Sequence, residues 1–309
     1  SVVTPISDGK HNIIPVPKDF YYVGGNLDNG VIISDNSADA YDGKIDKTTW
    51  EYTTSLVGNQ FVWIPCTEEE YHKTDWGSQY VYGGYDKSGP SQEEIDKVKR
   101  YNGFYVARYE AGLADGIKEY SGNQLSVSSN NSTGYNSCGI PKSKAGELPW
   151  IFISQTNSKS SSEKMYENNN YVTSGLITGT QWDVMLNKFI STTNANKITF
   201  TDADMKNSRQ WGNYYNNNIK YTGRSATLFQ NGNSWYISPW GTDKVNADTG
   251  VETYTEYTTG ASKVTEAYHT YDVAGNLWEA TEEIGQGTNC RVRRGGTAYS
   301  WSHLYPVCN

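Results

Sequence analysis

The chain ends on a run of side chains suited to contacting another molecule. Residues 299–305 read YSWSHLY and follow the basic run RVRRGG at 291–296. Tyrosine and tryptophan supply large, stiff contact areas, while serine and histidine supply adaptable hydrogen bonds, a mixture typical of antibody binding loops. We therefore expect this stretch to form a ligand-binding surface. The predicted contact residues are Tyr299, Ser300, Trp301, Ser302, His303 and Tyr305, with Arg293 and Arg294 at the rim.

The same stretch also allows a structural interpretation. The alternation of Tyr299 and Trp301 fits one face of a buried strand, in which case the aromatic side chains fill the core. The arginines could pair with nearby acids such as Asp272 and Glu282 instead of a ligand. The double glycine at 295–296 offers no side chain to pack, so it predicts a bulge or close backbone approach that turns the following residues toward solvent.

A tight turn is predicted upstream, in DVAGNLWE at residues 272–279. Gly275 and Asn276 both tolerate a positive φ, as a tight turn between two strands requires. Trp278 then points to the face of the strand opposite Glu279, because successive side chains of a strand alternate. We expect Trp278 in the core, since a tryptophan in a strand usually buries its large ring.

The spacing of the cysteines and histidines indicates neither a metal site nor a reactive thiol. The cysteines lie far apart without a CxxC pair, and the histidines show no metal-ligand spacing. We expect free or buried thiols, and the sequence leaves a Cys290–Cys308 or a Cys138–Cys290 disulfide open. The residues concerned are Cys66, Cys138, Cys290, Cys308, His11, His72, His269 and His303.

The composition is typical of a folded protein rich in short strands and loops. Of the 309 residues, 14% are aromatic, which favours a packed core over disorder. Only 19% are charged, and the net charge of -8 argues against a nucleic-acid partner, which would require a basic face. No apolar run is long enough to cross a bilayer, and no signal peptide opens the chain. Because the chain starts without a methionine, we expect it to be a trimmed piece of a longer protein.

Short strands and a few helices must hold the candidate residues in place. Residues 91–101 predict a helix with Ser91 as its N-cap, and 154–170 predict a weak helix. The clearest helix is 177–190, whose apolar side chains recur at i, i+3, i+4 and i+7 after a cap at Thr178 or Thr180. Strands are predicted at 31–34, 59–66, 103–109, 271–283 and 290–301, the last two joined by a glycine-containing loop.

Five motifs in this order resemble one known family. FVWIP, GFYVARYE, GTQWDVMLNKF, YDVAGNLWE and RVRRGG follow one another as in the formylglycine-generating-enzyme-like branch of the C-type lectin fold. Within it the chain is most similar to the variable proteins of diversity-generating retroelements of gut bacteria and phages. The resemblance implies an α+β fold with a small mixed or antiparallel sheet, two main helices and long irregular loops. It covers residues 56–309, with insertions near 113–148 and 191–265, and leaves 1–55 as an N-terminal packing or linker segment.

The resemblance implies binding rather than catalysis. In the variable proteins, the residues after R-G-G form a solvent-facing ligand surface, so we expect a non-catalytic binding or adhesion protein at a cell or phage surface, outside the cell. The enzymes of the family carry two cysteines there, and the corresponding positions fall near Ser300 and Tyr305, neither of which is cysteine. Relatives that use iron require a histidine-rich site, which this chain lacks. The formylglycine-generating type of oxidase is therefore the least favoured interpretation.

The resemblance also bears on cofactors and partners. It permits a calcium ion on the side-chain oxygens of Asn276 and Glu279, although such side chains in turns more often bond backbone amides. No other cofactor is expected. The calcium-dependent sugar triplets E-P-N and Q-P-D are absent from the sequence, so we expect a protein receptor rather than a glycan.

One further interpretation is a structural subunit of a phage particle or surface appendage. Such a subunit would need a large apolar patch for obligate assembly, and the sequence leaves oligomerisation open. Family members continue several dozen residues beyond R-G-G, whereas this chain stops at Asn309. We therefore expect either a truncated chain or a fold that closes differently.

Overall fold

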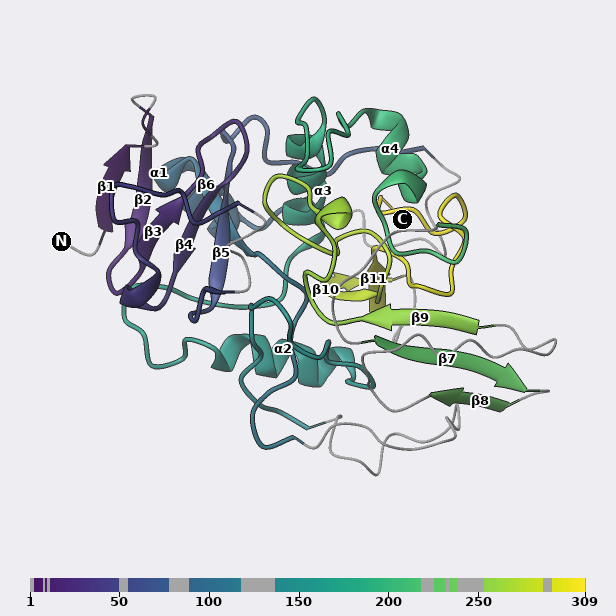
Figure 1. Cartoon of the computed structure of the whole chain (residues 1–309). Helices are drawn as coiled ribbons and strands as arrows, with labels where there is room; N and C mark the ends of the chain where they lie inside the picture. Colours follow the sequence, from purple (N-terminus) through teal and green to yellow (C-terminus); the bar gives the residue numbers. More distant parts are fainter. Residues whose placement is uncertain are drawn as a thin grey trace.

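The computed structural model shows an α+β chain in which small antiparallel sheets and helices are joined by long connections (Figure 1). None of the described helices combines the length and the apolar composition that crossing a membrane requires. The structure describes residues 3–7, 9, 12–49, 55–77, 89–117, 137–217, 225–231, 234–237, 253–285 and 291–308, with only the backbone described for 225–231, 234–237 and 253–254.

The main sheet is antiparallel, with strand order β3-β4-β5-β6 (Figure 1). Val62 on β5 lies opposite Val106 on β6, and every residue of β4 is buried. Apolar runs of this length between turns form central strands because both faces are covered. The strands predicted at 31–34, 59–66 and 103–109 are thereby confirmed. The strands are β3 (Tyr21–Gly24), β4 (Val31–Ser34), β5 (Gln60–Pro65) and β6 (Gly103–Ala107).

The boundary expected near residue 55 does not separate two structural units. Strand β4 precedes this position and β5 follows it, yet they pair in one sheet, with Ile32 opposite Val62. The earlier hairpin of β1 (Val3–Ser7) and β2 (Ile13–Pro17) contributes the buried side chain of Ile14, which packs with Val31 and Trp63 of the main sheet. The described residues of the N-terminal segment therefore pack against the rest of the chain, which is one of the two alternatives given for it.

The predicted helices form, and their caps explain where they begin. Helix α1 (Gln92–Tyr101) starts with a capping box between Ser91 and Glu94. Helix α3 (Gly179–Phe189) starts with a second box between Thr178 and Gln181. In each, the paired side chains satisfy backbone N–H groups that have no partner within the helix. The remaining α-helices described are α2 (Gln155–Lys164) and α4 (Asp202–Lys206).

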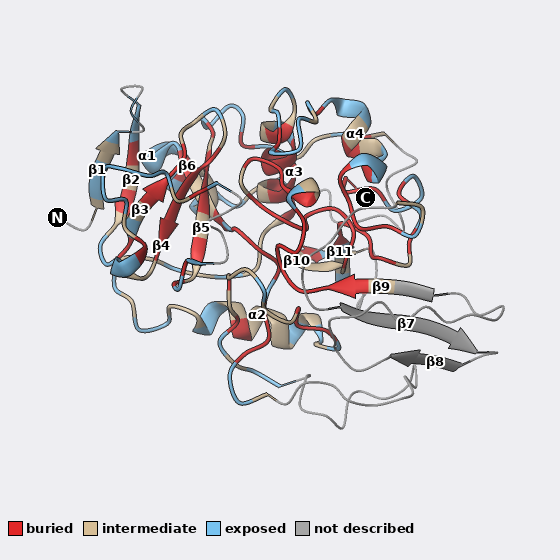
Figure 2. Cartoon of the chain, in the orientation of Figure 1, coloured by how far each residue is buried: buried red, intermediate tan, exposed pale blue. Residues whose placement is uncertain are grey.

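Helix α3 connects the main sheet to the C-terminal part of the molecule. It contacts both β5 and β10 (Glu279–Ile284), and its side chains Trp182, Leu186 and Phe189 are buried in the largest core (Figure 2). Val307, close to the end of the chain, lies in the same core. The C-terminal segment is therefore held by the centre of the fold.

The C-terminal hairpin of β10 and β11 (Arg291–Arg294) is antiparallel, but both strands are much shorter than the predicted 271–283 and 290–301. Gly275 and Asn276 before it have φ values of 74° and 60°, which confirms the tight turn. The predicted insertion at 191–265 contains β7 (Ser225–Asn231), β8 (Ser234–Ile237) and β9 (Thr253–Tyr257), paired in the order β8-β7-β9. This region also supplies core residues, because Trp211 and Phe200 are fully buried beside α3. Of the other predicted insertion, 118–136 lies outside the described residues.

Candidate functional site

In the segment after the double glycine, residues 300–303 alternate between the interior and the surface, and residues 303–305 are all exposed. Ser300 and Ser302 are buried, whereas Trp301 retains 47% of its surface and Tyr305 retains 37%. His303 is also exposed, and so is Leu304, which the sequence analysis did not include. The prediction of solvent-facing aromatic residues is therefore confirmed for Trp301 and Tyr305, whereas Ser300 and Ser302 face the interior.

The buried serines attach this segment to the loop at residues 207–217. The hydroxyl of Ser302 donates to Asn207 Oδ1 at 2.8 Å and accepts from Asn216 Nδ2 at 3.0 Å. The carbonyl of Ser300 accepts a hydrogen bond from the backbone N–H of Tyr215 at 3.1 Å. Buried hydroxyls that are fully bonded fix the backbone that carries their exposed neighbours.

The start of the segment depends on glycine. Gly295 and Gly296 have φ values of 88° and 76°, in the left-handed region that other residues avoid. A Cβ on Gly296 would lie 2.5 Å from the carbonyl oxygen of Tyr305, because the chain turns back over it. The turn is closed by the N–H groups of Leu304 and Tyr305, which both donate to the carbonyl of Trp301 at 3.0 Å. The predicted close backbone approach is confirmed.

The rings of this segment contact one another and rings from other parts of the chain. Trp301 contacts Tyr215 and His303, with ring centroids 5.4 Å and 5.9 Å apart. Trp278 contacts Tyr299 at 5.9 Å and Tyr305 at 6.2 Å. Such pairs stiffen side chains that would otherwise lose rotamer freedom on binding. We call the following set the aromatic surface: Tyr215, Trp278, Tyr299, Trp301, His303, Leu304 and Tyr305.

Two members of the aromatic surface differ from the sequence-based expectation. Trp278 is half-buried rather than a core residue, and the guanidinium of Arg293 lies 5.4 Å from the centre of its ring. Tyr215 was missed, because it lies in an Asn- and Tyr-rich loop without any periodic pattern. Its position became visible only from its contacts with Trp301 and Ser300.

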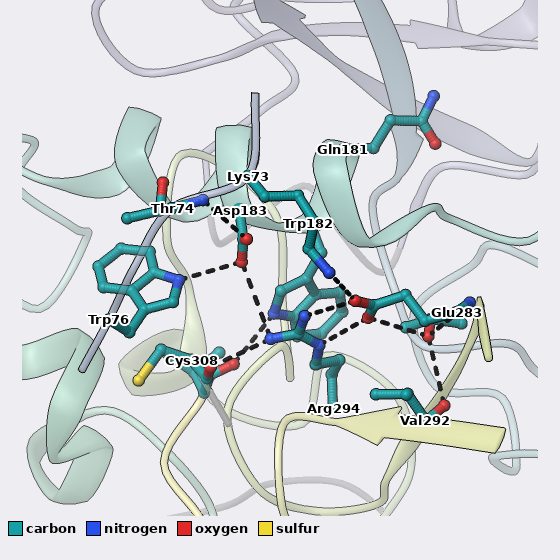
Figure 3. Close-up of polar contacts among 12 residues, drawn as sticks. Lys73, Thr74, Trp76, Gln181, Trp182, Asp183, Glu283, Val292, Arg294 and Cys308 are labelled. Atoms are coloured by element: carbon teal, nitrogen blue, oxygen red, sulfur yellow. Dashed lines mark hydrogen bonds and ion pairs between the residues drawn. The ribbon is translucent and has the colours of Figure 1, made fainter. Parts of the chain in front are cut away.

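Arg294 lies in the interior rather than at a rim, with 1% of its surface exposed. Its Nε and Nη2 donate to the two carboxylate oxygens of Glu283 at 2.8 Å each (Figure 3). Asp183 on α3 lies 3.8 Å from Nη1, and Lys73 also donates to Glu283. The arginine therefore forms ion pairs, as the alternative interpretation expected, but not with Asp272 or Glu282. Arg293, one residue earlier, is exposed.

This buried network holds the end of the chain in place. Arg294 Nη1 donates to the carbonyl of Cys308 at 3.1 Å, and Trp182 Nε1 donates to that of Val307 at 3.0 Å (Figure 3). Burial alone would raise the pKa of Glu283, but hydrogen bonds from Arg294 and Lys73 outweigh it and hold this pKa below its usual value. Glu283 therefore stays charged, and the network fixes both ends of the segment 295–308.

The two residues of the calcium prediction differ in how they are bonded. The amide of Asn276 donates to Glu110 Oε2 at 2.7 Å and accepts from Asn213 Nδ2 at 2.9 Å and from Tyr257 N at 2.9 Å. The carboxylate oxygens of Glu279 are buried and have no hydrogen-bond partner among the residues that the structure describes. Burial, with a contribution from the nearby Glu110, raises the pKa of Glu279 well above its usual value.

Glu279 is thus the member of the pair that fits a hard cation. The side-chain amide of Asn276 is already hydrogen-bonded to other residues of the protein. Within the part of the chain that the structure describes, no group of three His, Cys, Asp or Glu side chains converges on one point. Calcium binding stays a prediction, and it now rests on Glu279.

The described cysteines carry free thiols. Cys66 and Cys308 are buried, and burial raises the pKa of each thiol to about 12, so both stay protonated near neutral pH. Cys138 is exposed and also free. Because Cys138 and Cys308 are free, neither disulfide left open by the sequence is formed in the structure. Cys290 itself lies outside the described residues, as does His11.

Comparisons with protein-family models, with curated proteins and with solved structures find no match to this chain.

Proposed function

We propose that this chain is a non-catalytic binding protein that contacts a protein partner through the aromatic surface. The supporting observation is that the bonded serines at 300 and 302 face inward, whereas Trp301, His303 and Tyr305 face solvent. An arrangement that fixes the backbone and exposes large rings favours binding, because little side-chain freedom remains to be lost. The scaffold we propose is the C-type lectin type, and the setting is a cell or phage surface outside the cell.

The position of Arg293 at the edge of the surface supports a partner with polar groups beside its apolar contacts. The guanidinium covers one side of Trp278 and remains solvent-accessible, so it can also bond a partner. Aromatic residues and arginine are the side chains that carry most binding energy in protein interfaces. A protein receptor therefore accounts for this surface better than a glycan does.

Sequencing of this gene across isolates tests the proposal most directly. A diversified binding surface predicts substitutions at the exposed positions Trp301, His303, Leu304 and Tyr305. Ser300 and Ser302 should stay constant, because their hydroxyls fix the backbone. Uniform sequence throughout 299–305 would contradict diversification and favour the structural subunit of a particle or appendage.

A binding measurement separates these two candidates further. Fluorescently labelled protein should bind intact target cells, and the double variant Trp301→Ala and Tyr305→Ala should lose this binding. Tyr101→Ala, an exposed tyrosine on α1, is the matched control and should bind normally. Protease treatment of the cells should abolish binding to a protein receptor, whereas binding that survives protease but not glycosidase would identify a glycan. A subunit of an assembly would instead sediment as an oligomer. Neither the double variant nor Tyr101→Ala would prevent this oligomer from forming.

A further inference from the structure

A cavity of about 290 Å³ opens on another part of the molecule and shares no residue with the aromatic surface. It lies where the segment 263–271 meets two loops that are distant in sequence. This volume is near the lower end for small-molecule sites, ~300 Å³, and therefore suits a metabolite better than a peptide or an oligosaccharide. The lining residues are Thr48, Thr49, Ala195, Lys263, Glu266, His269 and Tyr271.

The backbone beside the cavity is held in an unfavourable conformation. Tyr268 and His269 are consecutive non-glycine residues with φ values of 52° and 63°. The conformation is maintained by hydrogen bonds at both residues: the Tyr268 hydroxyl donates to the carbonyl of Leu27 at 2.6 Å, and His269 N donates to Glu266 Oε1 at 2.6 Å. Strain that the surroundings maintain in this way is concentrated at functional sites.

The imidazole of His269 presents a hydrogen-bond acceptor. Its Nδ1 lies 2.9 Å from the carbonyl oxygen of Gly30, which can only accept, so Nδ1 carries the proton. The lone pair of the neutral ring is therefore on Nε2, which has no hydrogen-bond partner among the described residues. Burial lowers the pKa of His269; the Glu266 carboxylate opposes this effect and the guanidinium of Arg108 adds to it, and the net shift is downward, which favours the neutral ring.

Charges of both signs line the cavity. The buried carboxylate of Glu266 accepts one backbone N–H on each oxygen, from His269 and from Ala195 at 2.7 Å, and each oxygen keeps a further lone pair. The exposed ammonium of Lys263 makes no hydrogen bond or ion pair within the described part of the chain. The carboxylate of Glu266 can thus accept hydrogen bonds from a cationic group of a ligand. The ammonium of Lys263 can bind an anionic group.

A buried arginine stands behind the wall of the cavity. Arg108 donates to the carbonyls of Thr48 and His269 and to Gln60 Oε1, and none of the described carboxylates pairs with it. Its guanidinium also lies 5.5 Å from the ring centroids of Tyr109 and Tyr271. This positive charge behind the wall favours a ligand that brings a negative group of its own.

We propose that this cavity binds a small zwitterion, such as a free amino acid. The ammonium group of the ligand bonds Glu266 and the Nε2 of His269, and its carboxylate pairs with Lys263. Both ends are recognised by charge-assisted hydrogen bonds, which are the stronger class.

Isothermal titration calorimetry with L-serine, and with two analogues that each lack one charged group, tests the assignment. Ethanolamine lacks the carboxylate and 3-hydroxypropanoate lacks the ammonium, so each should bind at least about tenfold more weakly than serine. L-glutamine should bind as well, because it shares both charged groups. Equal binding of serine and either analogue would overturn the zwitterion assignment, and failure of every free amino acid to bind would overturn the site.

Variants assign the individual contacts. Lys263→Gln removes an exposed, unpaired charge and leaves the fold intact, so it should weaken serine binding about tenfold. Lys44→Gln, an exposed lysine elsewhere, is the matched control. His269→Asn keeps a residue that tolerates positive φ and should also weaken binding of serine. If Lys263→Gln binds serine as tightly as Lys44→Gln does, the assignment of the carboxylate to Lys263 is wrong.

Discussion

Arg294 and Glu283 meet in a bidentate ion pair inside the protein, with two N–H to oxygen distances of 2.8 Å. The two residues lie on paired strands, β11 and β10, and Asp183 of α3 adds a second carboxylate at 3.8 Å. The pair therefore joins the C-terminal hairpin to the central helix. It also fixes the backbone of Cys308, and with it the far end of the segment that carries the aromatic surface.

Removing the arginine should strongly destabilise the protein. Arg294→Met leaves Glu283 and Asp183 buried with only Lys73 to compensate them, and breaking a buried pair costs about 3–5 kcal/mol. Arg293→Met is the matched control, because it removes an exposed arginine and a cation–π contact worth about 1 kcal/mol or less. Urea unfolding of both variants measures the difference, and equal losses would contradict the structural role of Arg294.

The aromatic surface should contribute little to folding. Trp301→Ala removes a half-exposed ring, so we expect a loss of about 1 kcal/mol or less in the free energy of unfolding. Trp211→Ala removes a fully buried ring from the main core and should cost about 3–5 kcal/mol. Thermal or urea unfolding of the two variants checks this. A loss for Trp301→Ala as large as that for Trp211→Ala would mean that the ring is a core residue.

Calcium should stabilise the protein through Glu279. At a free calcium concentration about 100 times the Kd, binding to the native state adds about 2.7 kcal/mol, which raises the Tm. Glu279→Gln should abolish the rise because it removes the buried carboxylate without a partner. Glu282→Gln, which alters a carboxylate paired with Lys159, should preserve it. Scanning calorimetry measures the Tm of each protein with calcium and with a chelator. If the Tm of the native protein is the same in both conditions, the site is excluded.

Asp272 should oppose the usual gain of stability with rising pH. Burial raises its pKa from 3.8 to about 6, although hydrogen bonds from Gly260 and Thr265 favour the charged form. An acid with a raised pKa binds its proton more tightly in the folded state, so its contribution is greatest below 3.8 and declines as the pH rises through about 6. Asp272→Asn removes this decline. Across that pH range, the free energy of unfolding of the variant should rise relative to that of the native protein. A difference between the two that does not change with pH would refute the raised pKa.

The helices and strands were predictable because their signals are local. The apolar spacing of 177–190 and the cap at Thr178 predict α3, and the pair Gly275 and Asn276 predicts the turn before the hairpin. Each signal depends on side chains a few residues apart, which the chain order already brings together. The aromatic content after the double glycine likewise predicted solvent-facing rings, and Trp301 and Tyr305 are exposed.

The roles of individual side chains in this surface depended on distant residues. Alternation shows that Arg293 and Arg294 face opposite sides, but not which one is buried, and that depends on Glu283 and on Asp183 from a separate helix. Ser302 turned inward because Asn207 and Asn216 offer it partners there. Local sequence determines which backbone conformation a segment prefers. Which of its side chains face the interior is decided by groups that only the folded chain brings within bonding distance.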